Sequence, residues 1–263
     1  MKLQILPARK GAQWVKLGIK TFFRQPLALS GLFFMFMAMM SILSMVPLLG
    51  NVLALMLLPG ITLGLMAATQ EAGKGNFPMP LLLLSAFRAG KKELRAMLVL
   101  GAIYAAGFLL MLGLSALADG GKFARMYLVG GNVTAELLQS ADFELAVLIT
   151  MVLYMPLSLM FWHAPALVHW HGVSPVKSLF FSLVACLRNF WPITVFGLVW
   201  LGVFLAMGVV VATIATLAGN PELVGVMMFP GVLLMAAMFF TSLYFSFRDT
   251  FEEPVTDTTG ATP

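Results

Sequence analysis

Residues 12–49 read AQWVKLGIKTFFR-QP-LALSGLFFMFMAMMSILSMVPLL: a basic stretch, a Gln-Pro pair and then an uncharged apolar run. Lys16, Lys20 and Arg24 recur every fourth residue, which places them along one stripe of a helix. Pro26 ends that helix because it has no N–H to continue the hydrogen-bond ladder. The run Leu27–Leu49 has no charged residue and exceeds the roughly 20 apolar residues that cross a bilayer. The stretch predicts a surface helix followed by a membrane-spanning helix.

Five further runs have the same uncharged, apolar character. They are Val52–Gln70, Ala96–Ala118, Leu145–Val168, Pro192–Leu217 and Leu223–Phe247. The 263-residue chain is 10% charged, against roughly 25% in soluble domains. Backbone groups in lipid must satisfy their own hydrogen bonds, so runs of this length form helices. The sequence predicts an all-α membrane protein with six transmembrane helices. Residues 1–248 form a single membrane domain, and residues 249–263 form a disordered, acidic cytoplasmic tail.

The six predicted helices group into three hairpins of one design. Each hairpin has a basic amphipathic stretch, an uncharged run, and a second run interrupted by one proline. The basic stretches end at Arg24, Arg95 and Arg188, and the prolines are Pro59, Pro156 and Pro230. All three units cross the membrane in the same order, which predicts parallel repeats over about residues 8–70, 80–168 and 174–247.

The basic residues predict the orientation of these helices. Of the 16 Lys and Arg residues, all but Lys122 and Arg125 lie on one predicted side of the membrane. The positive-inside rule makes that side cytoplasmic and puts both termini there. The net charge of +5 therefore reflects topology, and we expect no nucleic-acid partner.

The three basic stretches are predicted to be in-plane helices that reach lipid headgroups. Their bounds are Ala12–Arg24, Leu81–Arg95 and Ser174–Arg188. A Lys or Arg beside an anionic leaflet contributes about 1 kcal/mol to membrane binding. The candidate headgroup contacts are Lys16, Lys20, Arg24, Arg88, Lys91, Lys92, Arg95, Lys177 and Arg188. Two alternatives remain open: the charges only orient the helices, or they contact a protein partner or a second copy of the chain.

The prolines Pro59, Pro156 and Pro230 are candidates for a central path. A proline kinks a helix and frees a carbonyl, and transporters bind substrates at broken helices. Proline is also common in membrane helices, where neighbouring groups satisfy the freed carbonyls. His163, about one turn inside the membrane, is the fourth candidate. The other two histidines are expected at the interface, beside tryptophans.

Several chemistries are absent from the sequence. No predicted span contains Asp, Glu, Lys or Arg, and there is no phosphate-binding loop, zinc-binding helix motif or nucleophile elbow. We therefore expect no enzymatic activity. A single cysteine and unevenly spaced histidines predict no metal, haem or other cofactor, although bound haem or metal remains a third hypothesis. The methionines, and the pair Gly60 and Gly64, are predicted to serve helix packing.

Most of the chain resembles a known family. The most specific stretch is Phe161–Asn189, FWHAPALVHWHGVSPVKSLFFSLVACLRN, with Gln25–Leu27, Phe33–Ala38, Pro59–Thr69 and Phe239–Phe251 in support. These resemble a family of uncharacterised betaproteobacterial inner-membrane proteins, which implies a bacterial inner-membrane location but no functional residues. In pattern alone, the chain also resembles the membrane domain of some glycerophosphodiester phosphodiesterases, and this resemblance implies no catalytic residue.

Two functions follow from these patterns. The first is a non-enzymatic inner-membrane protein that engages anionic lipid or a protein partner through its basic cytoplasmic helices. The alternative is a permease or channel for a small or lipidic molecule, with its path near the three prolines.

Overall fold

The fold is seen in a computed structural model, which describes residues 2–130 and 134–251. No strand occurs in these two ranges. In chain order the helices are α1 (Arg9–Arg24), α2 (Pro26–Ser44), α3 (Leu49–Gly73), the 3₁₀ helix η1 (Pro80–Leu84), α4 (Ser85–Arg88), α5 (Lys91–Asp119), α6 (Lys122–Val129), α7 (Ala135–Leu138), α8 (Ala141–Trp162), α9 (Ala164–His171), α10 (Pro175–Arg188), α11 (Phe190–Leu217) and α12 (Leu223–Phe251).

The six predicted spans are confirmed as long apolar helices. They correspond to α2, α3, α5, the consecutive pair α8 and α9, α11 and α12, each long and apolar enough to cross a membrane. The chain is thus a multi-pass membrane protein. Arg24 and Arg188 lie just before α2 and α11, whereas Arg88 precedes α5 and Lys91, Lys92 and Arg95 lie in its first turns.

The helices form two compact units. The first, here the terminal unit, joins residues 2–24 to residues 187–251, and the second, the central unit, comprises the described residues between 25 and 186. In the terminal unit, α1 packs against α11 and α12. The sequence predicts three parallel repeats, each beginning with an in-plane helix. This arrangement stays a prediction.

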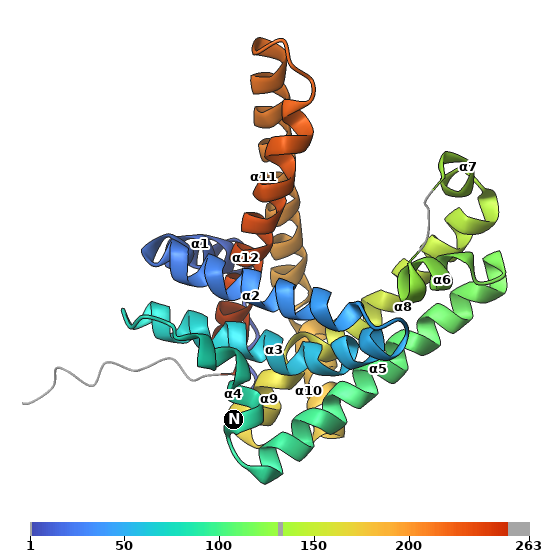
Figure 1. The fold of residues 1–263 in the computed structure, drawn as a ribbon. Coiled ribbons are helices and arrows are strands. Elements are labelled where there is room, and N and C mark those ends of the chain that lie inside the picture. Colours follow the sequence, from blue (N-terminus) through green and yellow to red (C-terminus); the bar gives the residue numbers. More distant parts are fainter. Residues whose placement is uncertain (1, 131–133, 252–263) are drawn as a thin grey trace, which may run out of the picture. The chain divides into compact units, whose positions relative to one another are not determined.

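The terminal unit depends on glycines in α1. The antiparallel helices α11 and α12 form a long hairpin, and α1 lies against both (Figure 1). A β-carbon at Gly11 would overlap the carbonyl oxygen of Pro192 and lie 2.6 Å from the backbone nitrogen of Phe196. A β-carbon at Gly18 would lie 2.7 Å from the Cα of Ser242. Because only glycine permits such approach, α1 contacts the hairpin backbone directly.

The predicted disordered tail does not begin at residue 249, because α12 continues to Phe251. The Asp249 carboxylate accepts hydrogen bonds from Lys10 Nζ at 2.9 Å, Trp14 Nε1 at 3.2 Å and Arg248 Nη2 at 2.8 Å. Donors from α1 and α12 therefore satisfy this carboxylate and stabilise the last turn of α12. Residues 252–263, the rest of the predicted tail, lie outside the described residues.

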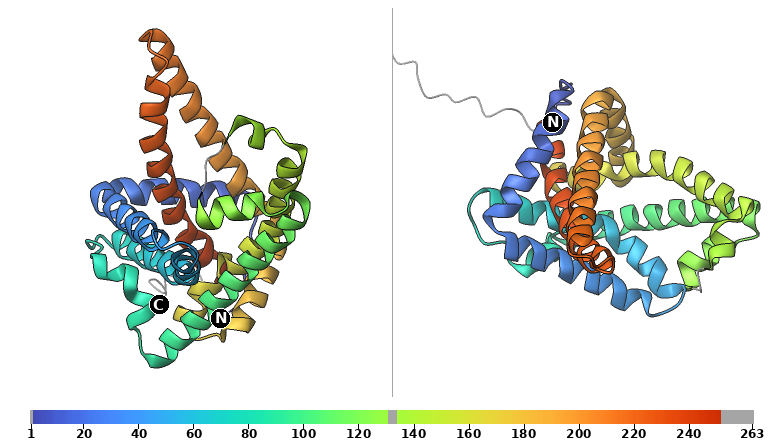
Figure 2. Two further views of the ribbon diagram at one scale, coloured as in Figure 1. Left: turned by 45° about the vertical axis from the view of Figure 1, so that its right-hand side comes forward. Right: turned by 90° about the horizontal axis from the view of Figure 1, so that it is seen from above.

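The central unit is built on α3 and α5. Helix α3 packs against both α2 and α5, and α5 packs along α8 (Figure 2). A β-carbon at Gly60 would overlap the Phe87 ring, and one at Gly64 would lie 2.6 Å from the Cα of Leu83. The predicted packing role of this glycine pair is confirmed, with η1 and α4 as the elements that approach.

The break in the fourth span lies at His163 and not at Pro156. Helix α8 continues through Pro156 and ends at Trp162. The Ser182 hydroxyl of α10 accepts a hydrogen bond from the His163 backbone N–H at 2.9 Å and donates one to the Leu159 carbonyl at 2.8 Å. These two backbone groups would bond each other in a continuous helix. A serine from α10 is therefore inserted into the ladder, two residues before Pro165.

Cys186, one turn after Ser182 on α10, should be inert towards thiol reagents in the folded protein. Its thiol is buried and donates to the Leu159 carbonyl, with 3.6 Å between Sγ and O. Burial raises the pKa of this thiol to about 12, so the reactive thiolate is absent at pH 7–8. We expect maleimide labelling only after denaturation, measured by mass shift. Stoichiometric labelling of the native protein at pH 7.5 would contradict the burial of Cys186.

Candidate lipid-binding surface

All nine predicted headgroup contacts are exposed on the structure. Lys16, Lys20 and Arg24 lie on α1, Arg88 ends α4, and Lys91, Lys92 and Arg95 lie in the first turns of α5, while Lys177 and Arg188 lie on α10. Exposure makes each cation available to an anionic surface. It does not separate a headgroup contact from a charge that only orients the helix.

The apolar face of α1 is covered by protein. Trp14 is 1% exposed, and its ring centroid lies 6.2 Å from that of Phe196 in α11. Gly11 and Gly18, on the same face, contact the backbones of α11 and α12. The amphipathic pattern of α1 therefore has its explanation in helix packing, and insertion of this face into lipid stays unconfirmed.

The second predicted in-plane helix, Leu81–Arg95, is wrong as one continuous element. The structure divides it into η1, α4 and the start of α5. The interruption falls at Gly90, whose φ of +143° is open to glycine but strained for other residues. Arg88 thus ends one helix, whereas Lys91, Lys92 and Arg95 begin a membrane-spanning helix. The four cations therefore do not lie on one continuous helix.

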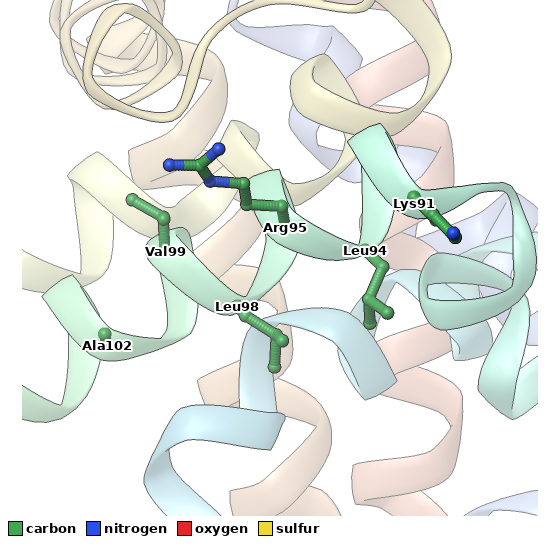
Figure 3. A pocket seen from close by; sticks show the side chains of 6 residues that line it. All are labelled: Lys91, Leu94, Arg95, Leu98, Val99 and Ala102. Atoms are coloured by element: carbon green, nitrogen blue, oxygen red, sulfur yellow. The ribbon is translucent and has the colours of Figure 1, made fainter.

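The start of α5 carries a shallow groove, here called the α5 groove. Its lining residues are Lys91, Leu94, Arg95, Leu98, Val99 and Ala102, and its volume is about 310 Å³. These positions recur every three or four residues, so they form one face of α5. Leu94 and Leu98 point to the same side of the helix, and the Arg95 guanidinium extends away from them past Val99 (Figure 3). Two cations therefore border an apolar strip.

The charges at the α5 groove are not neutralised by the protein. No acidic side chain in the described parts of the chain pairs with Lys91 or Arg95. Glu93 is the acidic residue of the same helical turn, but it lies near His169 of α9 and does not line the groove. The groove therefore presents positive charge.

The predicted path residues have different surroundings. Pro59 is buried in α3, whereas Pro156 in α8 and Pro230 in α12 are exposed. His163 is 2% exposed and marks the break between α8 and α9. None of these four lines the α5 groove. A conduit near the three prolines stays a prediction.

The apolar half of the α5 groove was not predicted from the sequence. Leu94, Leu98, Val99 and Ala102 lie in or beside a run assigned wholly to the membrane. If the helix is taken to start at Lys91, the spacing of three or four residues shows that they share one helix face with Lys91 and Arg95. That start depends on Gly90, whose role was not foreseen.

The comparisons with known proteins agree with the membrane assignment. A probable inner membrane protein of Burkholderia thailandensis is 37% identical over 259 residues, covering 97% of this chain and 96% of the relative. No protein-family model matches the chain, and no solved structure matches it. The predicted resemblance to betaproteobacterial inner-membrane proteins is confirmed.

Proposed function

Because the chain belongs to the family of this Burkholderia inner-membrane protein, we propose that it is a non-enzymatic protein that binds anionic phospholipid through the α5 groove. Its termini lie in the cytoplasm, which the distribution of Lys and Arg supports. The groove then opens at the inner leaflet, where anionic lipids gather.

The observation that carries the proposal is the order of chemistry along the α5 groove. Lys91 and Arg95 lie in the first two turns, and Leu98, Val99 and Ala102 continue along the same face into the membrane-spanning part. A phospholipid has the same order, with an anionic phosphate followed by an apolar chain. Arg95 offers a planar fork of donors to phosphate, and Lys91 offers a compact positive charge.

The dimensions of the groove favour a lipid over a folded partner. The α5 groove, with a volume of about 310 Å³ on one helix face, accommodates a single extended chain. Stable protein interfaces are much larger and bury roughly 800 Å² on each partner. A protein partner or a second copy of the chain would need surface beyond this groove.

The test is the paired substitution Lys91→Ala with Arg95→Ala. Losing two cations at about 1 kcal/mol each should weaken binding of phosphatidylglycerol roughly 30-fold. The full-length protein in zwitterionic detergent micelles is titrated with phosphatidylglycerol or phosphatidylcholine, and bound lipid is counted by native mass spectrometry. Wild-type binding of phosphatidylglycerol should also weaken as salt is raised.

Lys92→Ala is the matched control, because Lys92 is exposed in the same turn but does not line the groove. It removes one charge and should change binding less than threefold. If the paired variant retains phosphatidylglycerol as well as the wild type does, the α5 groove is not the lipid site. If Lys92→Ala matches the paired variant, diffuse charge explains the binding instead.

A further inference from the structure

A second pocket lies within the central unit, among α3, α5, α6 and α8, and has a volume of about 350 Å³. Apart from Thr150 its lining is apolar and aromatic, and no charged side chain takes part. The chain has four tyrosines, and three of them, Tyr104, Tyr127 and Tyr154, line this one pocket. We call it the tyrosine pocket. Such a concentration of one residue type calls for an explanation beyond filling space.

The rings in the tyrosine pocket surround Phe108. The Phe108 ring centroid lies 6.2 Å from that of Tyr104, 5.1 Å from that of Tyr127 and 6.3 Å from that of Tyr154. Tyr104 also packs edge-on against Phe161 at 4.8 Å. The aromatic faces and edges therefore come from three helices, α5, α6 and α8, and their mutual packing fixes their orientations.

The usual reason for tyrosine in a membrane protein does not apply to Tyr104 or Tyr154. Belt tyrosines lie at the membrane–water interface. Tyr104 lies eight residues after the start of the uncharged run Ala96–Ala118, and Tyr154 lies nine residues after the start of Leu145–Val168, which is about 12–14 Å along the axis. In a hydrocarbon core about 30 Å thick this depth is far from either surface. Phenol hydroxyls at that depth require hydrogen-bond partners.

The protein supplies only part of that requirement. The Tyr104 and Tyr154 side chains interact with each other, and one bond between two hydroxyls leaves one donor unused. Tyr127 is 47% exposed and Tyr154 is 42% exposed, and within the described residues the Tyr127 hydroxyl makes no hydrogen bond, so it is open to a ligand. The Thr150 hydroxyl donates to the Ala146 carbonyl at 2.8 Å, and no tyrosine in the described residues donates to its oxygen. The tyrosine pocket thus offers phenol donors among aromatic faces, and no carbonyl or carboxylate of the described residues accepts from them.

The complementary ligand is a flat ring with carbonyl acceptors. Aromatic side chains stack on planar rings, and phenol hydroxyls donate to carbonyl oxygens. At roughly 30 Å³ for each water-sized group, the pocket admits about a dozen non-hydrogen atoms. That is room for one substituted ring and too little for a two-chain phospholipid. An acyl chain would fit the volume but would leave the phenol donors without acceptors.

We propose that the tyrosine pocket binds the ring of a lipid-soluble quinone, with the Tyr127 hydroxyl and the one free donor of the Tyr104–Tyr154 pair donating to its two carbonyl oxygens. The exposed side of α8 at Met151, which is 66% exposed, lets an isoprenoid tail leave the pocket into the surrounding lipid. This site is separate from the α5 groove and does not depend on it.

The test uses the full-length protein in detergent and a short-chain benzoquinone as the probe. Saturable binding near one molecule per chain is expected by equilibrium dialysis, above the partition into protein-free micelles. The double substitution Tyr104→Phe with Tyr154→Phe keeps the rings and removes two hydroxyls. It should weaken binding about tenfold, which is the effect of losing roughly 1–1.5 kcal/mol of hydrogen bonding.

Tyr244→Phe is the matched control, because Tyr244 is the fourth tyrosine and lies in α12, outside the tyrosine pocket. It should bind the probe as the wild type does. Solvent extraction of the purified protein, analysed by mass spectrometry, should also yield a prenylated quinone. Absence of saturable binding overturns the proposal, as does equal binding by the double variant. Extraction of phospholipid alone would overturn it as well.

Discussion

Gly11→Ala should disrupt the terminal unit and produce the largest loss of stability expected here. The new β-carbon would overlap the Pro192 carbonyl oxygen and lie 2.6 Å from the Phe196 nitrogen. Both are backbone atoms of α11, so no side chain can rotate to make room. Overpacking costs about 1–3 kcal/mol where side chains can adjust, and here we expect at least the upper value. Thermal unfolding followed by size-exclusion chromatography measures the loss.

Gly197→Ala is the matched control. Gly197 also lies in a helix of the terminal unit, but a β-carbon there would have no atom within 4 Å. Alanine is favoured over glycine in a helix by about 1 kcal/mol, so this variant should be neutral or slightly more stable. If Gly11→Ala unfolds at the same temperature as Gly197→Ala, α1 does not rest on the backbone of α11.

The sequence predicts the membrane-spanning helices well for a simple physical reason. Lipid requires each span to satisfy its own backbone hydrogen bonds, so length and the absence of charge suffice to locate α2, α3, α5, α11 and α12. The predicted runs fall on these helices with ends that differ by a few residues. Local composition carries this information, and no knowledge of the neighbouring helices is needed.

The partners of α1 could not be predicted in the same way. Its stripe of Trp14, Val15 and Phe22 suits a lipid surface as well as a protein surface. The discriminating residues are Gly11 and Gly18, which allow contact with α11 and α12 far away in the sequence. A glycine in an isolated helix shows only a cost in helix propensity. Its benefit appears once the opposing backbone is in place.

Asp249 illustrates the same limit at the other end of the chain. In the sequence it begins a segment rich in Thr, Pro and acidic residues, which favours disorder. In the structure its carboxylate receives hydrogen bonds from Lys10 and Trp14, which lie more than 230 residues away along the chain. These hydrogen bonds connect α1 to the end of α12. Helix α12 therefore extends to Phe251, beyond the end that composition alone indicates.

Only the charged residues of the α5 groove were predicted from the sequence. Lys91 and Arg95 were among the candidate headgroup contacts because charge can be counted. The apolar strip below them was assigned to the span without a separate role. The helix break at Gly90 reconciles the two, because it sets Lys91 at the start of the same helix that carries Leu98 and Ala102.

The second large effect is expected from Ser182→Ala. Ser182 is fully buried. Its hydroxyl accepts a hydrogen bond from the His163 N–H and donates one to the Leu159 carbonyl, so it bridges these two backbone groups. Removing it takes the acceptor from the buried His163 N–H and leaves the Leu159 carbonyl with only the weak Cys186 thiol donor at 3.6 Å; an unmet buried polar group costs about 1–3 kcal/mol. We expect a total loss of roughly 2–4 kcal/mol, measured as the midpoint of chemical or thermal unfolding in detergent.

Ser178→Ala separates this role from burial alone. Ser178 is also fully buried on α10, but its hydroxyl donates within its own helix, to the Pro175 carbonyl at 2.7 Å. Losing that bond strands no group of another helix, so the cost should stay below about 1 kcal/mol. Ser182→Thr restores a hydroxyl and should recover part of the stability if its methyl group is accommodated. Equal stability of Ser182→Ala and Ser178→Ala would mean that the break at His163 closes without the serine, with the His163 N–H reaching the Leu159 carbonyl directly.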